Sequence, residues 1–331
     1  MTRPFPVSRR ATLSLLGAAA ALPLLPARAV AQPMDTLALY GPPAGPSITL
    51  AHAVATERFS GIAETTTFSV WRNPDELRAG LTSGQIALSV VPIQAAANLY
   101  NRGFPIRLAN TMTDGLYYIL AEDAAIASIA DLAGRHIAVP FRGDTPEIVL
   151  SQLLAHHGLD AETDLRITYA GTPTEAMQLM LAGRVEAALT SEPGTTAGVL
   201  RARADGRELR RAIDVQAAWG EMTGAAPVLP QAGLAVTQGF LDDHGAALSD
   251  LLAALEAATA DVLADPEAAA ANATEALGMP APLLAASIPH ANLVARPASE
   301  ARADIERMLT AMAGPDMARI GGRLPDDAFY L

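Results

Sequence analysis

The chain has 331 residues, a formal net charge of −12 and an apolar fraction of 50%. This length exceeds what one hydrophobic core usually serves, so we expect two lobes, each with its own core. The acidic balance disfavours nucleic acid as a partner. The absence of cysteine excludes disulfides, a thiol nucleophile, a thiolate metal site and a lipid anchor carried on cysteine.

The first part of the chain, residues 1–31, predicts a secretory signal peptide. Arg9 and Arg10 precede an apolar run over residues 11–25, and the small residues after it suit cleavage before Gln32. The apolar run is too short for a stable transmembrane helix. The arginine pair resembles a twin-arginine signal, and a plain Sec signal that holds two arginines is the alternative. We expect a soluble periplasmic mature protein with a net charge of −16, because the removed segment carries four arginines and no acid.

The first lobe is predicted to begin in residues 32–113. Its expected elements are, in order, a strand at 36–40, a glycine-proline turn, a helix at 48–57, a strand at 66–71, a helix and strand over 73–92, a helix ending near Gly103, and a strand at 107–110. The segment TMTDG that follows reads as the crossing into the second lobe.

The turn between a strand at 136–140 and the next helix predicts a ligand site. A short helix capped by Ser128 and closed by a glycine precedes the strand. After the turn FRGDT, Asp144 is placed to cap a helix and Glu147 to reach back toward its start. Free backbone N–H groups at a helix N-terminus attract an anion or a polar group, so we expect one to dock here.

Two segments of the chain resemble each other at a spacing of 99 positions. Residues 73–92 and residues 172–193 each have a cap, a proline, a glutamate three residues after the cap, a closing glycine and a strand. This spacing is too long for a solenoid repeat. It suggests two lobes built on one α/β plan, with a ligand cleft at the carboxyl ends of their strands.

The second lobe is predicted over residues 114–229 and the return to the first lobe over residues 230–331. Alternating helices and strands in the second lobe imply a mostly parallel sheet. The expected elements are strands at 136–140, 165–169 and 185–190, a crossing near 229–237, and helices at 246–263, 266–277 and 299–312 that pack on the first lobe.

Several segments resemble one family of known proteins. DLAGRHIAVP (131–140), AGRVEAALTSEP (182–193), SGQIALSVVPIQAAANLYNRGFPIRLAN (83–110) and LADPEAAAANATEALGM (263–279) occur in the order and spacing of periplasmic solute-binding proteins of ABC transporters. The chain most resembles the sulfonate, nitrate and taurine group, which includes thiamine-precursor binders. The resemblance implies the α/β, two-lobed type II periplasmic binding fold, with a ligand cleft between lobes. It also implies that an ABC permease and its ATPase in the inner membrane are the partners of a monomeric protein.

The predicted ligand-binding residues lie on loops that would face each other across the cleft. They are Tyr40, Gly41, Trp71, Arg72, Pro92 and Gln94 in the first lobe, and Phe141, Arg142, Gly143, Asp144, Thr145, Ser191 and Glu192 in the second. Trp71 could wall off a ligand or pack in the core. Arg142 could clamp an anion or lie in solvent. The resemblance makes Glu192 a cleft residue that either bonds an amine or holds a loop.

The sequence contains no motif for catalysis, a metal or a cofactor. Metalloprotease, hydrolase, phosphate-loop and dinucleotide patterns are absent, so we expect no enzyme, no cofactor and no metal. The prediction is a periplasmic protein that delivers a small solute, with a sulfonate-, nitrate- or taurine-type anion favoured, to an ABC importer. The alternatives are an enzyme on the same fold, of a pyrimidine or menaquinone pathway, and a sensory receptor. Synthases of yeast type that share the fold rely on a cysteine-rich motif, which this chain lacks.

Overall fold

A computed structural model describes Met1 and residues 33–331 of the protein. The predicted signal peptide therefore lies almost wholly outside the described residues. Among the residues that are described, no helix is both long and apolar enough to cross a membrane.

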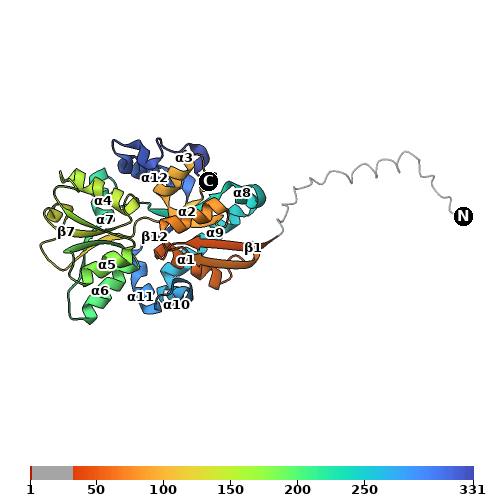
Figure 1. The fold of residues 1–331 in the computed structure, drawn as a ribbon. Helices are drawn as coiled ribbons and strands as arrows, with labels where there is room; N and C mark the ends of the chain where they lie inside the picture. Colours follow the sequence, from red (N-terminus) through yellow and green to blue (C-terminus); the bar gives the residue numbers. More distant parts are fainter. Residues whose placement is uncertain (2–32) are drawn as a thin grey trace. The chain divides into compact units, whose positions relative to one another are not determined.

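The first of two sheets is mixed in its strand directions (Figure 1). Its strands are β1 (Met34–Gly41), β2 (Ala63–Val70), β3 (Leu88–Pro92), β4 (Ile106–Leu108), β5 (Asn110–Thr113), β11 (Ala232–Thr237) and β12 (Leu293–Pro297). Strands β2, β1 and β3 are parallel neighbours. Strand β11 runs antiparallel to β3, β4 and β5, and β12 runs antiparallel to β5.

The second sheet has the order β10-β6-β9-β7-β8. Its strands are β6 (Tyr117–Ala121), β7 (His136–Pro140), β8 (Arg166–Ala170), β9 (Ala187–Ser191) and β10 (Arg210–Asp214). Strands β8, β7 and β9 are parallel, whereas β6 is antiparallel to both β9 and β10. The predicted α/β class is confirmed, but each sheet is less parallel than expected. The reason is that β6 and β11 enter their sheets from the crossings and so run opposite to their neighbours.

Helices cover both faces of the first sheet because its strands alternate their apolar residues between the two sides. One face carries α1 (Gly45–Ala55), α9 (Leu248–Ala264), α10 (Pro266–Leu277) and α11 (Ala281–Ser287), and α8 (Gln238–His244) lies at its edge. The other face carries α2 (Pro74–Ser83), α3 (Ile93–Asn101) and α12 (Ala298–Ala313). In β3, Val90 belongs to the core of the first face and Val91 to the core of the second.

The second sheet is also covered on both faces, as Figure 1 shows with α4 and α7 above it and α5 and α6 below it. These helices are α4 (Thr145–His156), α5 (Pro173–Leu181), α6 (Gly194–Ala204) and α7 (Val215–Thr223). Helices α5 and α6 enclose a separate small core. Helices α4 and α7 share one continuous core with α12 of the first lobe.

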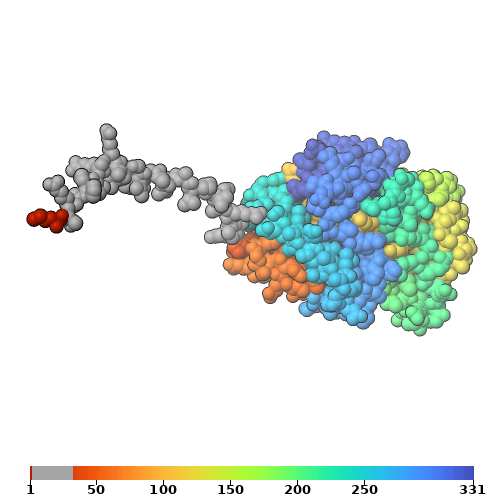
Figure 2. All heavy atoms as spheres, turned by 180° about the vertical axis from the view of Figure 1, so that it is seen from behind, coloured from red at the N-terminus to blue at the C-terminus, as the bar shows by residue number. Residues whose placement is uncertain are grey.

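Two crossings join the lobes, and helix α12 packs across their junction. The first crossing runs from β5 to β6 and the second from α7 to β11, and they are hydrogen-bonded to each other from Leu229 N to Asp114 O at 2.9 Å. Helix α12 contacts α4, and in Figure 2 the blue C-terminal segments lie directly beside the green surface of the second lobe. Met308 and Leu309 of α12 are almost fully buried in the shared core. The loops at the strand ends are therefore positioned by a packed joint between the lobes.

The two similar segments form the same local structure in different sheets. Asn73 caps α2 by accepting from Glu76 N at 2.9 Å, and Thr172 caps α5 by accepting from Glu175 N at 3.1 Å. Both glutamates reach back to the backbone N–H of the residue before the cap. The segment leads into β3 in the first sheet and into β9 in the second. Each lobe therefore contains one of the two similar segments.

Candidate functional site

The predicted site loops lie at the carboxyl ends of parallel strands in both sheets. Gly41 ends β1, Trp71 follows β2, Pro92 ends β3, the turn 141–145 follows β7, and Ser191 ends β9. Each of these loops leads into the N-terminus of a helix. In open α/β sheets this edge is where ligands bind. The arrangement turns the loops of the two lobes toward one another.

The two lobes touch along one side of this edge. Arg78 Nη2 of α2 lies 3.1 Å from Asp144 Oδ2, which stands at the start of α4. The Thr145 hydroxyl donates to Gln94 Oε1 of α3 at 3.4 Å. Gln94, Asp144 and Thr145 are all buried. Three of the predicted site residues are thus brought together from two lobes.

The lobes also touch along the other side. Gly45 N, at the start of α1, donates to the backbone carbonyl of Glu192 at 3.2 Å. The Tyr118 hydroxyl of β6 donates to the carbonyl of His290 at 3.0 Å. The two lobes therefore contact each other at two separate places beside the predicted site loops.

Glu192 holds the loop between β9 and α6. Its Oε1 accepts from Arg211 Nε at 2.9 Å and from Arg211 Nη2 at 2.5 Å. Its Oε2 accepts from the backbone N and the hydroxyl of Thr196, at 3.0 Å and 2.8 Å. The side chain has no exposed surface. Of the two roles that the sequence left open, this geometry matches the structural one, because four hydrogen bonds fill the carboxylate.

The turn after β7 differs from the expectation that its N–H groups are free. Asp144 Oδ1 accepts from Thr145 N at 2.9 Å, and Glu147 accepts from Gly143 N. The Tyr169 hydroxyl donates to the same Glu147 carboxylate at 2.6 Å, and burial together with this bond raises the pKa of Tyr169 to about 12. Two of the backbone donors in this turn, Gly143 N and Thr145 N, are therefore already bonded to the chain's own carboxylates.

Arg142 does not point into the contact between the lobes. Its guanidinium carbon lies 4.8 Å from the centre of the Tyr169 ring, on strand β8 of the second lobe. Tyr169 is one of the exposed large side chains of the protein. A cation over an aromatic face is attracted by the ring quadrupole. In this structure the Arg142 guanidinium is therefore engaged with Tyr169, and its role as an anion clamp stays a prediction.

Aromatic side chains stand at the strand ends. Trp71 is buried, and its Nε1 donates to Ser89 Oγ at 3.0 Å, so it forms part of the first lobe's core. Tyr40 is half-buried against the same core. Burial raises the pKa of Tyr117 above its usual range, and the negative charge of nearby Asp144 adds to this effect.

Backbone geometry at two predicted residues is tightly constrained. Phe141 has φ +56°, an uncommon value for a bulky residue, and Gly143 in the same turn has φ +77°. At Gly41, a β-carbon would lie 2.4 Å from Ser47 Oγ, so a larger residue there would require Ser47 to move. Arg72 is exposed, and its backbone N donates to Glu76. Pro92 is half-buried and caps α3, whereas Ser191 is buried.

Sequence reasoning missed two glutamines between the lobes. Gln231 accepts from Leu116 N at 2.6 Å, and Gln216 accepts from Tyr117 N at 2.9 Å. Both side chains are buried, and Gln231 Nε2 has no hydrogen-bond partner among the described residues. The sequence signal for Gln231 is its place as a polar residue in the otherwise apolar run that leads into β11.

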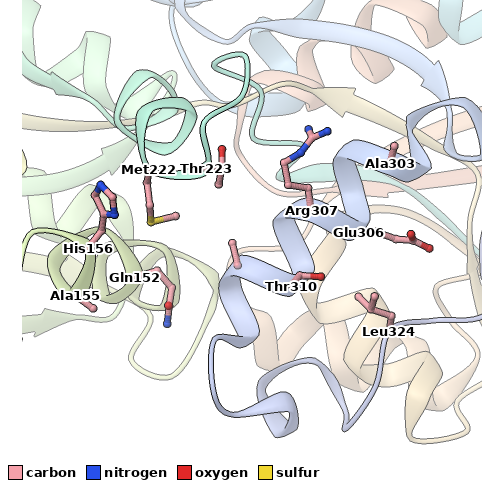
Figure 3. Close-up of a pocket in the computed structure, with 11 residues that line it drawn as sticks. Gln152, Ala155, His156, Met222, Thr223, Ala303, Glu306, Arg307, Thr310 and Leu324 are labelled. Atoms are coloured by element: carbon pink, nitrogen blue, oxygen red, sulfur yellow. The ribbon is translucent and has the colours of Figure 1, made fainter.

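Two hollows lie at the junction of the lobes. A cavity of about 430 Å³ borders the predicted site at Gln94 and Gly143 and extends to Arg102, Glu147 and Arg319. A larger groove of about 850 Å³ lies between α4 and α7 on one side and α12 on the other (Figure 3). This groove contains none of the predicted site residues. Among residues 33–331, no group of three histidines or carboxylates is arranged to hold a metal ion.

Comparison with known proteins defines the class of this fold. It is the two-lobed fold of periplasmic binding proteins, and 555 chains of solved structures match it. An ABC transporter structure from Parabacteroides distasonis is 24% identical with a TM-score of 0.70, over 89% of this chain and 98% of that one. The periplasmic aliphatic sulphonate-binding protein SsuA from Escherichia coli is 20% identical with a TM-score of 0.66, over 88% and 92%. The periplasmic nitrate-binding protein NrtA from Synechocystis PCC 6803 is 16% identical with a TM-score of 0.59, over 76% and 69%.

The family model described as NMT1/THI5 like matches residues 72–269, and the chain belongs to this family. The match includes the segments 131–140 and 182–193 that carried the resemblance, which is thereby confirmed. No curated protein sequence matches the chain.

Proposed function

We propose that this protein is an exported periplasmic solute-binding protein that delivers a small solute to an ABC permease and its ATPase. The observation that carries the proposal is the meeting of loops from two sheets at the carboxyl ends of their strands, with contacts on both sides. Such a site can bury a small ligand when the lobes close. Membership of the NMT1/THI5-like family and the fold of the solved relatives support the same role.

We propose a small anion of the sulfonate, nitrate or taurine type as the solute. Helix α1 begins at this edge with no acidic residue in its first turn and no side-chain cap, and its dipole makes the edge favourable for negative charge. The two buried acids there are already paired, Asp144 with Arg78 and Glu192 with Arg211. Neither of these two buried acids is therefore left uncompensated to repel an anion. Arg142 has no part in this proposal, because it lies over Tyr169.

The remaining parts of the proposal concern movement and location. We infer that the lobes move about the crossings near residues 113–117 and 227–232, so that residues 114–229 form the second lobe. The chain passes between the lobes at these two points, which would allow a hinge there. Export by the signal in residues 1–31 and a monomeric mature form complete the proposal.

A thermal-shift screen of the mature protein tests this function. The panel comprises taurine, ethanesulfonate, nitrate, a hydroxymethylpyrimidine and simple amines, each at millimolar concentration. A solute that binds only the folded form adds about 2.7 kcal/mol of stability at a hundred times its dissociation constant. The proposal expects a rise in the unfolding temperature with at least one anion and one-to-one binding in calorimetry.

Two outcomes of the screen would contradict the proposal in different ways. Stabilisation by an amine or a pyrimidine alone would overturn the anion and retain the binding function. Stabilisation by none of the panel, together with turnover of a panel compound, would favour the enzyme alternative.

A further inference from the structure

Two arginines that form no ion pair line a cavity between the lobes. The cavity of about 430 Å³ beside Gln94 and Gly143 is also lined by Arg102 and Arg319. In the part of the chain that the structure describes, neither guanidinium has a carboxylate within ion-pair distance. Arg102 is exposed, and Arg319 is half-buried. The cavity wall therefore carries two positive charges that no ion pair neutralises.

Residue spacing on two helices turns one face of each toward this cavity. On α3, Gln94, Asn98 and the C-cap residue Arg102 are four positions apart, so they share one face. The lining residues of α4 and of the turn before it recur at the same spacing, namely Gly143, Glu147 and Ser151. Helix α3 belongs to the first lobe and α4 to the second, so both lobes form the wall of the cavity.

Side chains of α3 and α4 position the 3-10 helix Met317–Ile320, which carries Arg319. Asn98 Nδ2 donates to the Arg319 carbonyl at 3.2 Å, and Gln94 Nε2 donates to the same oxygen. With its amide oriented to satisfy both of its neighbours, Gln152 of α4 accepts from Arg319 Nη1 at 2.5 Å. The Arg319 guanidinium is therefore held at the junction of the lobes by a neutral partner, and its charge stays available to an anion.

Two acids in the cavity wall are already bonded to the chain. Glu147 accepts from Gly143 N and, at 2.6 Å, from the Tyr169 hydroxyl. Asp316 Oδ1 accepts from Ala318 N at 3.0 Å and so caps the 3-10 helix. These acids offset the net charge of the cavity. An oxyanion here is therefore bound by hydrogen bonds from the two guanidiniums and not by a net positive field.

The larger groove between α4, α7 and α12 has the opposite arrangement. Its charged residues Glu306 and Arg307 are both paired, with Arg302 at 2.8 Å and with Asp304 at 2.7 Å. Most of the other residues that line it are small or apolar (Figure 3). Of these two hollows, the smaller one is therefore the one that offers unpaired guanidinium donors.

We propose that Arg102 and Arg319 together bind the oxyanion group of the solute in the smaller cavity. A sulfonate, sulfate or phosphate group presents several oxygens, and each planar guanidinium can donate two parallel hydrogen bonds to such a group. The cavity of about 430 Å³ accommodates the group together with a short organic chain. This inference rests on the proposed function, because it names the residues that bind the charged group of the solute.

Calorimetry with inorganic sulfate and with ethanesulfonate, at constant ionic strength, tests this site. We expect one-to-one binding of both anions to the mature protein. Arg102→Gln and Arg319→Gln should each weaken both affinities about tenfold or more, because each change removes charge-assisted hydrogen bonds to the anion. Arg319→Lys keeps the charge but loses the planar fork, so it should retain more affinity than Arg319→Gln and less than the wild type.

Matched controls separate this site from a general effect of charge. Arg184 is exposed and likewise has no ion pair in the described part of the chain, and it does not line the cavity. Arg184→Gln should leave both affinities unchanged. Asp316→Asn keeps an oxygen that can cap the 3-10 helix and removes a negative charge from the wall, so it should strengthen the binding of both anions. Circular dichroism confirms that each variant folds, and Arg102→Gln at an exposed position tests the site if Arg319→Gln does not fold.

The proposal is overturned if the wild type binds neither sulfate nor ethanesulfonate. It is also overturned if Arg102→Gln and Arg319→Gln bind both anions as tightly as Arg184→Gln does.

Failure of the proposed function would look different. If sulfate binds through both arginines while no compound of the thermal-shift panel stabilises the protein, the oxyanion site stands and the delivery of an organic solute is contradicted. If a panel compound stabilises the wild type and both arginine variants equally, the binding function stands and these arginines do not bind the solute.

Discussion

Breaking the buried pair between Glu192 and Arg211 should destabilise the second lobe strongly. Glu192 is fully buried, and Arg211 is 20% exposed and supplies two of the four hydrogen bonds to the carboxylate. Breaking a buried pair typically costs about 3–5 kcal/mol. Thr196 retains two hydrogen bonds to Glu192, and the partial exposure of Arg211 screens the charge. We therefore expect Arg211→Met to lower the free energy of unfolding by about 2–3 kcal/mol.

Urea unfolding followed by tryptophan fluorescence measures this loss, since both tryptophans are buried. Adding Glu192→Gln to Arg211→Met should recover part of the stability, because the unpaired charge is then gone. Arg201→Met is the control, and loss of its exposed pair should cost less than about 1 kcal/mol. If Arg211→Met unfolds at the same urea concentration as the control, the carboxylate does not depend on Arg211, and our description of this loop is wrong.

Three further predictions follow from the sequence and the structure. Mass spectrometry of the periplasmic protein should find a chain that begins at Gln32, and changing Arg9 and Arg10 to lysine should block export only if the twin-arginine route is used. Arg142→Ala should leave the thermal shift given by a stabilising anion within error, because this side chain lies over a ring on β8; a lost shift would restore the anion clamp. Burial lowers the pKa of His136, so the folded form binds fewer protons than the unfolded chain below pH 6.5. Stability should therefore fall as pH drops below that value, and His136→Gln should flatten the decline in unfolding temperature between pH 7 and pH 5; an unchanged slope would assign the decline to other groups.

Local sequence signals predicted the elements that carry capping residues. The caps at Asn73, Asp144 and Thr172 mark the starts of α2, α4 and α5, because each side chain satisfies a backbone N–H that the helix leaves unpaired. The two similar segments likewise occur in different sheets. The predicted short helix before β7 is a 3-10 helix, Ile129–Leu132, with Ser128 at its N-cap.

Strand β12 was missed because five residues that end in a proline give no clear alternation, and only pairing with β5 defines them. The antiparallel direction of β6 and β11 was not predicted either. The direction of these strands depends on how the chain crosses between the lobes, which the local sequence does not indicate.

The directions and contacts of the side chains in the site could not be predicted from the sequence. Arg142 and Glu192 were both placed on the right loops, yet one lies over Tyr169 and the other is held by Arg211. Arg211 lies nineteen positions from Glu192 in sequence, and nothing in the chain near either residue indicates the contact.

Hydrogen exchange measured by mass spectrometry, with and without a stabilising solute, tests the central claim most directly. If the solute binds between the lobes, peptides that cover 40–45, 71–73, 92–94, 141–145 and 191–193 should all gain protection at the same solute concentration. The larger groove between α4, α7 and α12 should show no separate protection. Protection confined to one lobe, or centred on that groove, would contradict a solute site between the two lobes.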